Sequence, residues 1–246
     1  MKKAIVLLSG GLDSAVTLAL ALACKREVYP LAFDYGQRNK KELRSASQIV
    51  SHYSKLRQPI RSLKLVGMTG LDFDTSALTS ALDVPKIEDI DGSSPGATYV
   101  PARNSIFLAI GASFAEALEA SEVWVGFNDA GPVNPPDPTT TMGRLRALAG
   151  PDHTRYPDCS PEFVTAFQGA LAVGTLCGAQ GRPISLMAPL VRMTKQAIVE
   201  EGVRLEAPLG VTWSCYTAEN RPCGDCSACF IRRLAFDAAN LADPAL

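Results

Sequence analysis

The feature of this sequence that most constrains its fold is a glycine-containing stretch between two apolar segments near its start. Ala4–Leu8 is an apolar run of strand length, and Ala15–Ala23 is rich in alanine and leucine, which favour helix. Between them lies Ser9–Ser14, with the sequence SGGLDS. Glycine lets a backbone turn tightly and approach a ligand, and the first amides of a helix are unpaired donors. The pattern predicts a strand, a turn and a helix whose amino end binds an anion such as phosphate.

An ordinary structural turn is the alternative interpretation, because Ser-Gly-Gly is a common turn sequence and Asp or Ser often caps a helix. No lysine follows the glycines as in a Walker A loop, and no third glycine stands at the dinucleotide-binding spacing. The stretch instead resembles the PP-loop of the ATP pyrophosphatases. Members of that superfamily break ATP between its α- and β-phosphates and adenylate a substrate oxygen. The resemblance implies an ATP site at this turn.

Apolar segments of strand and helix length alternate along the rest of the chain. Further strands are expected at Val28–Phe33, Arg61–Val66, Glu122–Gly126 and Ile184–Ala188. Further helices are expected at Lys40–His52, Ser105–Leu118, Pro161–Leu176 and Ser227–Leu241, together with a short helix that Thr194 caps. This alternation predicts an α/β fold with a doubly wound, mostly parallel five-stranded sheet, which the resemblance identifies as adenine nucleotide alpha-hydrolase-like. Ligands bind such sheets at the carboxyl ends of the strands.

Composition divides the chain into two predicted parts. Residues 1–205 form the expected PP-loop ATP-binding domain, with a proline-rich insertion at 129–151. Residues 206–246 form a small C-terminal element with a terminal helix and a four-cysteine pattern, C-x7-C-x2-C-x2-C, made by Cys215, Cys223, Cys226 and Cys229. Four thiolates can enclose one Zn²⁺ and leave no position for water, so we expect a structural zinc. An iron–sulfur cluster is the alternative.

Length and charge exclude several classes of protein. The 246 residues carry a net charge of −1 and are 47% hydrophobic, which gives no general attraction to nucleic acid. No apolar segment is long enough to span a bilayer. The start of the chain resembles a secretory signal, but Asp13 and the two glycines interrupt its apolar part. We therefore expect a cytoplasmic protein that contacts neither membrane nor nucleic acid.

Further motifs extend the resemblance over nearly the whole chain. They are Leu8–Ser14, Phe33–Arg38, Tyr99–Asn104, Gly126, Asn128, Asp152, Tyr156–Cys159, Lys195, Trp213–Tyr216 and the four cysteines. In this order they resemble the 7-cyano-7-deazaguanine synthases, the QueC family of queuosine biosynthesis. That family turns the carboxylate of 7-carboxy-7-deazaguanine into a nitrile with ammonia and ATP. Adenylation supplies a leaving group, ammonia gives the amide, and a second activation of the amide oxygen permits dehydration.

The resemblance also implies roles for residues of this chain. Catalysis is implied for Asp13, Ser14, Arg103 and Lys195, with Asp13 helping to bind Mg²⁺ and the basic side chains neutralising phosphate charge. ATP binding is implied for Leu8, Ser9, Gly10, Gly11, Leu12, Asp13, Ser14, Phe33, Gln37 and Arg38. Substrate binding is implied for Tyr99, Arg103, Asn104, Asn128, Asp152, Tyr156 and Asp158. Taken alone, Asn104 is equally an ordinary helix cap. Relatives suggest a homodimer.

Three departures from the family pattern keep other hypotheses open. Asn39 stands where the family usually has histidine, Ser160 stands where it commonly has arginine, and the 129–151 insertion replaces a short turn. A related protein could therefore couple the activated carboxylate to a protein or peptide amine and stop at an amide. A non-catalytic nucleotide sensor is the third hypothesis, although retention of the four catalytic positions argues against it.

Overall fold

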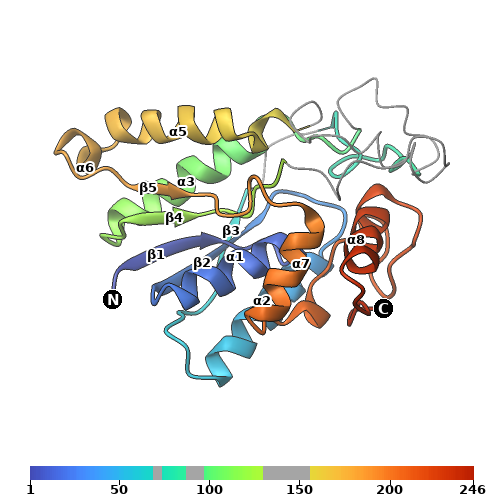
Figure 1. Ribbon diagram of the computed structural model, residues 1–246. Helices are drawn as coiled ribbons and strands as arrows, with labels where there is room; N and C mark the ends of the chain where they lie inside the picture. The colour runs from blue at the N-terminus through green and yellow to red at the C-terminus, as the bar shows by residue number, and fades with distance from the viewer. Residues whose placement is uncertain (69–73, 87–96, 130–155) are drawn as a thin grey trace.

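Five parallel strands form the sheet that organises the chain (Figure 1). The computed structural model describes residues 1–68, 74–86, 97–129 and 156–246. The strand order is β3-β2-β1-β4-β5, which confirms the predicted doubly wound parallel sheet. The strands are β1 Lys3–Leu7, β2 Glu27–Asp34, β3 Lys64–Gly67, β4 Glu122–Trp124 and β5 Ser185–Met187. Because β4 lies on the opposite side of β1 from β2, the chain reverses its winding direction there, and ligands bind such sheets beyond the strand ends at this reversal.

Helices cover both faces of the sheet (Figure 1). One face carries α1 Leu12–Ala23 and α2 Lys41–Lys55, with α7 Lys195–Arg204 packed beside α1. The other face carries α3 Arg103–Ala117 and α5 Pro161–Gly174. The remaining elements are α6 Leu176–Ala179, α8 Ser227–Ala238 and two short 3₁₀ turns, η3 Pro157–Cys159 and η4 Leu209–Val211.

The apolar character of β1 follows from burial on both faces. Ala4 and Val6 pack into the cluster that includes α1 and α2, whereas Ile5 packs into the cluster that includes α3. All three side chains are buried. A strand covered on both faces has no polar side, so a continuous apolar run is the expected pattern for a central parallel strand.

Several predicted helix ends are shifted in the structure. The first helix begins at Leu12 with Gly11 as its N-cap, three residues earlier than predicted, so Asp13 lies inside the first turn. Asn104 does not cap α3, because that helix begins at Arg103 and its N-cap is Ala102. The long helix predicted to reach residue 176 ends at Gly174, where an extended Thr175 starts α6.

The starts of two helices agree with the sequence prediction. The Thr194 hydroxyl accepts a hydrogen bond from the Ala197 amide at 3.2 Å, and α7 begins directly after it. Pro161 occupies the first position of α5, where its missing N–H costs no helical hydrogen bond. Local chemistry therefore predicted the start of these two helices correctly.

A buried ion pair joins α8 to the last residues of the C-terminal segment. Arg232 of α8 contacts both carboxylate oxygens of Asp243, at 2.6 and 2.8 Å, and both side chains are at most 7% exposed. The same guanidinium donates to the Thr212 hydroxyl at 2.8 Å. These bonds fix the segment that precedes the four cysteines. The proposed boundary between residues 205 and 206 stays a prediction.

Asp152 and residues 130–151 of the predicted insertion lie outside the described residues. None of the helices that the structure describes has the length and hydrophobicity of a membrane span.

Candidate active site

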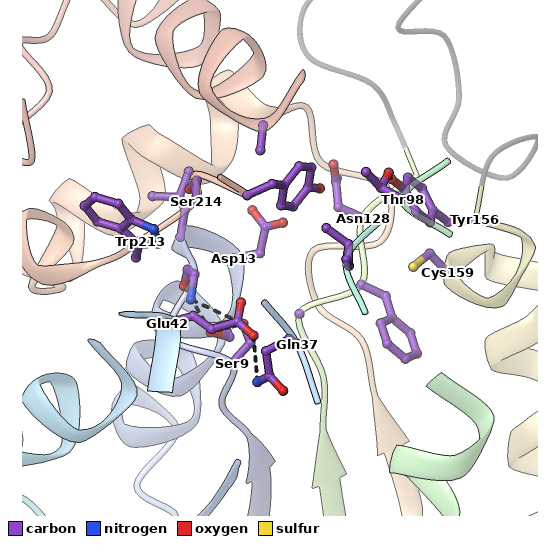
Figure 2. Close-up of a pocket in the computed structure, with 18 of the residues that line it drawn as sticks. Ser9, Asp13, Gln37, Glu42, Thr98, Asn128, Tyr156, Cys159, Trp213 and Ser214 are labelled. Atoms are coloured by element: carbon purple, nitrogen blue, oxygen red, sulfur yellow. Dashed lines mark hydrogen bonds between the residues drawn. The ribbon is translucent and has the colours of Figure 1, made fainter. Parts of the chain in front are cut away.

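A cavity of about 350 Å³ opens at the carboxyl edge of the sheet, beside the loop between β1 and α1 (Figure 2). Its volume falls within the range of about 300–1,000 Å³ typical of small-molecule sites. Most residues that the sequence predicted for ATP and substrate line it. They are Leu8, Ser9, Gly11, Leu12, Asp13, Ser14, Phe33, Gln37, Arg103, Asn104, Asn128, Tyr156 and Lys195.

The loop between β1 and α1 is held in shape by its own side chains. Ser14 Oγ donates to the Gly11 carbonyl at 3.0 Å and accepts the Gly10 amide at 3.2 Å. Gly10 has φ +93°, and a Cβ there would lie 2.0 Å from the backbone oxygen of Glu42. Only glycine fits this left-handed, closely packed position. Because α1 starts at Leu12, its first amides have no partner within the helix and are available to an anion.

Asp13 and Lys195 meet on the wall of the cavity. They come from the first turns of α1 and α7 and form an ion pair through Asp13 Oδ2. The other oxygen, Asp13 Oδ1, is buried and has no hydrogen-bond partner among the described residues. A buried carboxylate oxygen without a donor is costly unless a cation or donor binds there. Its position fits a Mg²⁺ ion carried by a nucleotide.

The loop after β4 closes the cavity on the opposite side from Trp213 (Figure 2). Asn128 donates to the Leu190 carbonyl at 3.1 Å and also to the Met193 carbonyl, which fixes its side chain. Its Oδ1 is buried and has no hydrogen-bond partner in the described part of the chain. Asn128 therefore lines the cavity and carries a buried acceptor that no described residue satisfies.

Arg103 supplies positive charge at the start of α3. Its Nη1 donates to the Tyr35 hydroxyl at 3.1 Å, and its guanidinium lies 5.6 Å from the centre of the Tyr35 ring. Phe33 and Phe107 stack beside it with ring centres 4.0 Å apart. No carboxylate of the described residues lies within ion-pair distance of Arg103. The described residues thus place a guanidinium without a carboxylate partner beside two stacked aromatic side chains that line the cavity.

Glu42 is a site residue that the sequence analysis missed. It lines the cavity from the first turn of α2, and its Oε1 accepts a hydrogen bond from Gln37 Nε2 at 3.0 Å (Figure 2). Burial raises the pKa of its carboxyl to about 7, against the smaller opposing effect of Arg103. The sequence contains one signal that could have identified it. Glu42 lies on the same face of the helix as Ala46, Ile49 and Tyr53, which are buried.

Four predicted site residues within the described part of the chain do not line the cavity. Asp158 is buried beside it and accepts the Asn104 amide at 3.1 Å, so its carboxylate caps α3. The Tyr99 hydroxyl accepts the Ala102 amide at 3.1 Å, and Arg38 Nη1 donates to the Leu82 carbonyl at 2.6 Å. Gly10 lies behind the loop against α2. Roles of these residues in ligand binding stay predictions.

The two departures from the family pattern have structural roles here. Asn39 Nδ2 donates to the carbonyls of Cys215 and Ala218, at 2.8 and 2.7 Å. Ser160 Oγ accepts the Phe163 amide at 3.0 Å and caps α5. The first links the start of α2 to the cysteine segment, and the second stabilises a helix by about 1 kcal/mol.

The four cysteines form one cluster that could hold a metal ion. The Sγ atoms of Cys215, Cys223, Cys226 and Cys229 all lie within 4.8 Å of one another. Backbone amides of Ala218 and Cys223 both donate to Cys215 Sγ at 3.4 Å. Hydrogen bonds from the Cys226 and Cys229 thiols lower the pKa of Cys215. A thiolate-rich cage of this size fits a tetrahedral metal such as zinc.

The cysteine cluster is connected directly to the loop between β1 and α1. The Trp213 amide donates to the Gly10 carbonyl at 2.9 Å, and Trp213 Nε1 donates to the Cys215 carbonyl at 3.0 Å. Ser214, Cys215 and Tyr216 line the cavity. The four-cysteine segment therefore forms part of one wall of the same cavity.

Comparison with known proteins places this geometry in a family. The sequence matches the family described as "Queuosine biosynthesis protein QueC" over residues 3–144 and 145–240. It is 38% identical to a 7-cyano-7-deazaguanine synthase of Acetivibrio thermocellus, covering 99% of this chain and 96% of that protein. It is 40% identical to the 7-cyano-7-deazaguanine synthase of Ralstonia pickettii, covering 99% of this chain and 97% of that protein.

Among solved structures, a 4-thiouridine synthetase bound to RNA and ATP is similar, with 18% identity and a TM-score of 0.44. The alignment covers 97% of this chain and 53% of that one. The family match and the full-length relatives agree with the motifs and with the sheet described above. The chain belongs to the QueC family of queuosine biosynthesis proteins.

Proposed function

We propose that this chain is an ATP-dependent carbon–nitrogen ligase that converts the carboxylate of 7-carboxy-7-deazaguanine into the nitrile of 7-cyano-7-deazaguanine. Ammonia supplies the nitrogen, and each activation converts ATP to AMP and pyrophosphate. The observation that carries the proposal is the Asp13–Lys195 pair, which lines the cavity beside the loop between β1 and α1 and whose buried Asp13 Oδ1 has no hydrogen-bond partner among the described residues. Relatives named 7-cyano-7-deazaguanine synthase, aligned over nearly their whole length, support the choice of substrate.

The reaction requires activation because hydroxide is a poor leaving group from a carboxylate. The substrate carboxylate attacks the α-phosphorus of ATP, pyrophosphate leaves, and AMP becomes the leaving group. Mg²⁺, when bound, neutralises phosphate charge during this step. The amides at the start of α1 and the Lys195 ammonium stabilise the charge that develops on the departing pyrophosphate.

In this proposal the positive charge of Arg103 reduces the repulsion between the two reacting anions. Two anions, the substrate carboxylate and the α-phosphate, must come within bonding distance despite their repulsion. Arg103 reaches the cavity without an ion-pair partner among the described carboxylates, so it can hold the substrate carboxylate. Ammonia attack then gives the amide, and the same site activates the amide oxygen for dehydration.

Substrate recognition is assigned by chemistry and position. The stacked Phe33 and Phe107 provide a flat surface for a purine-like ring. Asn128 Oδ1 provides a free acceptor for a ring N–H or amino group. Tyr156 and Asn104 line the same cavity. Asp158 would need to exchange its α3 amide for a substrate donor, so we place it behind the binding wall.

The remaining features of the proposal concern metal and assembly. We assign zinc to the four-cysteine cluster as a structural ion, since four thiolates leave no open coordination position. We also propose a cytoplasmic homodimer. Coupling to a protein or peptide amine and nucleotide sensing are disfavoured, because the full-length relatives are named as synthases.

Product analysis distinguishes these activities. The purified protein is incubated with 7-carboxy-7-deazaguanine, ATP, Mg²⁺ and ammonium, and the products are identified by mass. The proposal predicts nitrile together with AMP. AMP that accumulates with amide but never with nitrile would support the coupling activity instead. Nucleotide binding without any AMP formation would support the sensor.

A further inference from the structure

The cavity is lined by a carboxyl group that has no role in the adenylation steps proposed above. Two carboxyl groups line it in the described part of the chain, those of Asp13 and Glu42. Asp13 is paired with Lys195. Glu42 is not within ion-pair distance of a basic group among the described residues and is held instead by the neutral amide of Gln37. A half-buried carboxyl is costly to keep in a cavity, which suggests a chemical use.

The orientation of Glu42 is fixed on one side and open on the other. Gln37 Nε2 donates to Glu42 Oε1 at 3.0 Å and to the Phe33 carbonyl at 3.0 Å, and its Oε1 accepts the Tyr35 amide at 2.9 Å. Gln37 is therefore locked, and it presents a donor to a single oxygen of Glu42. Glu42 Oε2 has no hydrogen-bond partner among the described residues. One oxygen is anchored while the other remains available to a ligand.

The proposed reaction includes a proton transfer to which no residue has yet been assigned. Ammonia exists mostly as ammonium at neutral pH, and ammonium has no lone pair for attack on an acyl adenylate. Formation of the amide from bound ammonium therefore requires a base that removes one of its protons. On the proposed function, we infer that Glu42 is the catalytic residue that accepts a proton from the ammonium substrate and so delivers ammonia to the adenylate.

The step balances as follows in atoms and charge. Glu42 Oε2 takes one proton from ammonium, and the freed lone pair attacks the carbonyl carbon of the adenylate. The bond from that carbon to the AMP oxygen breaks, and its electron pair leaves with AMP. The second surplus proton on nitrogen passes to the departing phosphate or to solvent. The products are the amide, AMP and protonated Glu42, which releases its proton before the next turnover.

The surroundings suit this exchange near neutral pH. Burial raises the pKa of Glu42 to about 7, while Arg103 from α3 and Lys40 before α2 lower it. Tyr35 stays protonated, because burial raises its pKa to about 12. Across the cavity the Asp13–Lys195 pair is self-neutralised, and the segment after η4 lines it with the uncharged Trp213 and Ser214 (Figure 2). A base with this pKa can both accept and release a proton.

The test separates adenylation from ammonia attack. Glu42→Gln removes the basic oxygen and keeps the shape of the side chain. The matched control is Glu219→Gln, because Glu219 is exposed and forms an ion pair with Arg44, which lies on α2 like Glu42. Exchange of labelled pyrophosphate into ATP, driven by 7-carboxy-7-deazaguanine without ammonia, measures adenylation. We expect Glu42→Gln to stay within about threefold of wild type in exchange and to lose about 10²–10³-fold in amide and nitrile formation from ammonium.

The choice of nucleophile and the pH dependence of the rate give two further measurements that would not change in this way if Glu42 had only a structural role. Hydroxylamine is unprotonated near neutral pH and needs no base, so Glu42→Gln should form the hydroxamate near the wild-type rate. At fixed total ammonium, the wild-type rate should rise with pH and level off above about 7, where the carboxyl is ionised. The Glu42→Gln rate should keep rising through the alkaline range with the fraction of free ammonia. Because Glu42→Asp keeps a carboxylate, this variant should recover part of the wild-type rate and also the plateau of the rate at alkaline pH.

Each result decides between the alternatives. Unchanged ammonia-dependent turnover and pH profile in Glu42→Gln would overturn the inference and leave the proposed function intact. Equal losses in exchange, hydroxamate and nitrile would show that Glu42 serves adenylation or folding instead, which also overturns it. Failure of the wild type to exchange pyrophosphate with the deazaguanine carboxylate would refute the proposed function itself, and this role with it.

Discussion

Replacing Asp13 by asparagine is expected to lower AMP formation at least ~10³-fold while the metal centre remains filled. A single group aimed at developing charge is commonly worth about 10²–10³ in rate, and Asp13 also holds Lys195 in the cavity. Asparagine keeps the shape but removes the charge that both Lys195 and a nucleotide-bound Mg²⁺ require. Pyrophosphate release and metal content, measured on the same preparation, test this prediction.

The matched control for this substitution is Asp34→Asn. Asp34 also forms an ion pair with a lysine, Lys40, but it does not line the cavity in the described structure. We expect this variant to retain AMP formation within a few-fold, because its charge pair is about one-third exposed and contributes little. Equal losses in both variants would mean that Asp13 acts through general electrostatics or stability. Loss of metal from Asp13→Asn would show that the two sites are not independent.

Replacing Cys226 by serine is expected to remove the metal and destabilise the protein. In small domains without another core, zinc binding contributes about 10–16 kcal/mol to folding. This chain has an independent core around its sheet, so we expect a smaller loss of roughly 3–5 kcal/mol, or about 6–20 °C in melting temperature. Metal analysis and thermal unfolding measure both effects. Cys24→Ser, at an exposed cysteine, is the matched control.

The same substitution should also weaken nucleotide binding. The Trp213 and Asn39 hydrogen bonds connect the cysteine segment to the Gly10 loop and to the start of α2. Loosening that segment removes one wall of the cavity, so ATP affinity should fall about tenfold or more, equivalent to about 1.4 kcal/mol. A Cys226→Ser protein that stays metal-free, stable and fully able to bind ATP would contradict the structural role of the cluster.

The sheet and the nucleotide loop were predictable because their signals are local. The apolar run that became β1 reflects burial on both faces, and the glycines reflect a backbone that passes within contact distance of α2. The cysteine cluster was predictable from spacing alone. In each case the residue type and its immediate neighbours specify the geometry.

Other parts of the site depend on contacts between distant segments, which no local pattern reveals. Asn104 resembled a helix cap, but it lies in the first turn of α3, where its amide donates to the Asp158 carboxylate, 54 positions away. Asn39 stands where the family usually has histidine, and it anchors the cysteine segment. The sequence analysis did not single out Glu42. Its role becomes visible only when α2 packs against the loop after β1.

The most direct test of the account follows the oxygen atoms of the substrate. The carboxylate of 7-carboxy-7-deazaguanine is labelled with ¹⁸O at both positions, and the AMP released during nitrile formation is analysed by mass. If carboxylate and amide oxygens are adenylated in turn at the Ser9–Ser14 loop, each AMP should carry one heavy oxygen and pyrophosphate should carry none. Unlabelled AMP, with the heavy oxygen found in pyrophosphate, phosphate or water, would contradict the account.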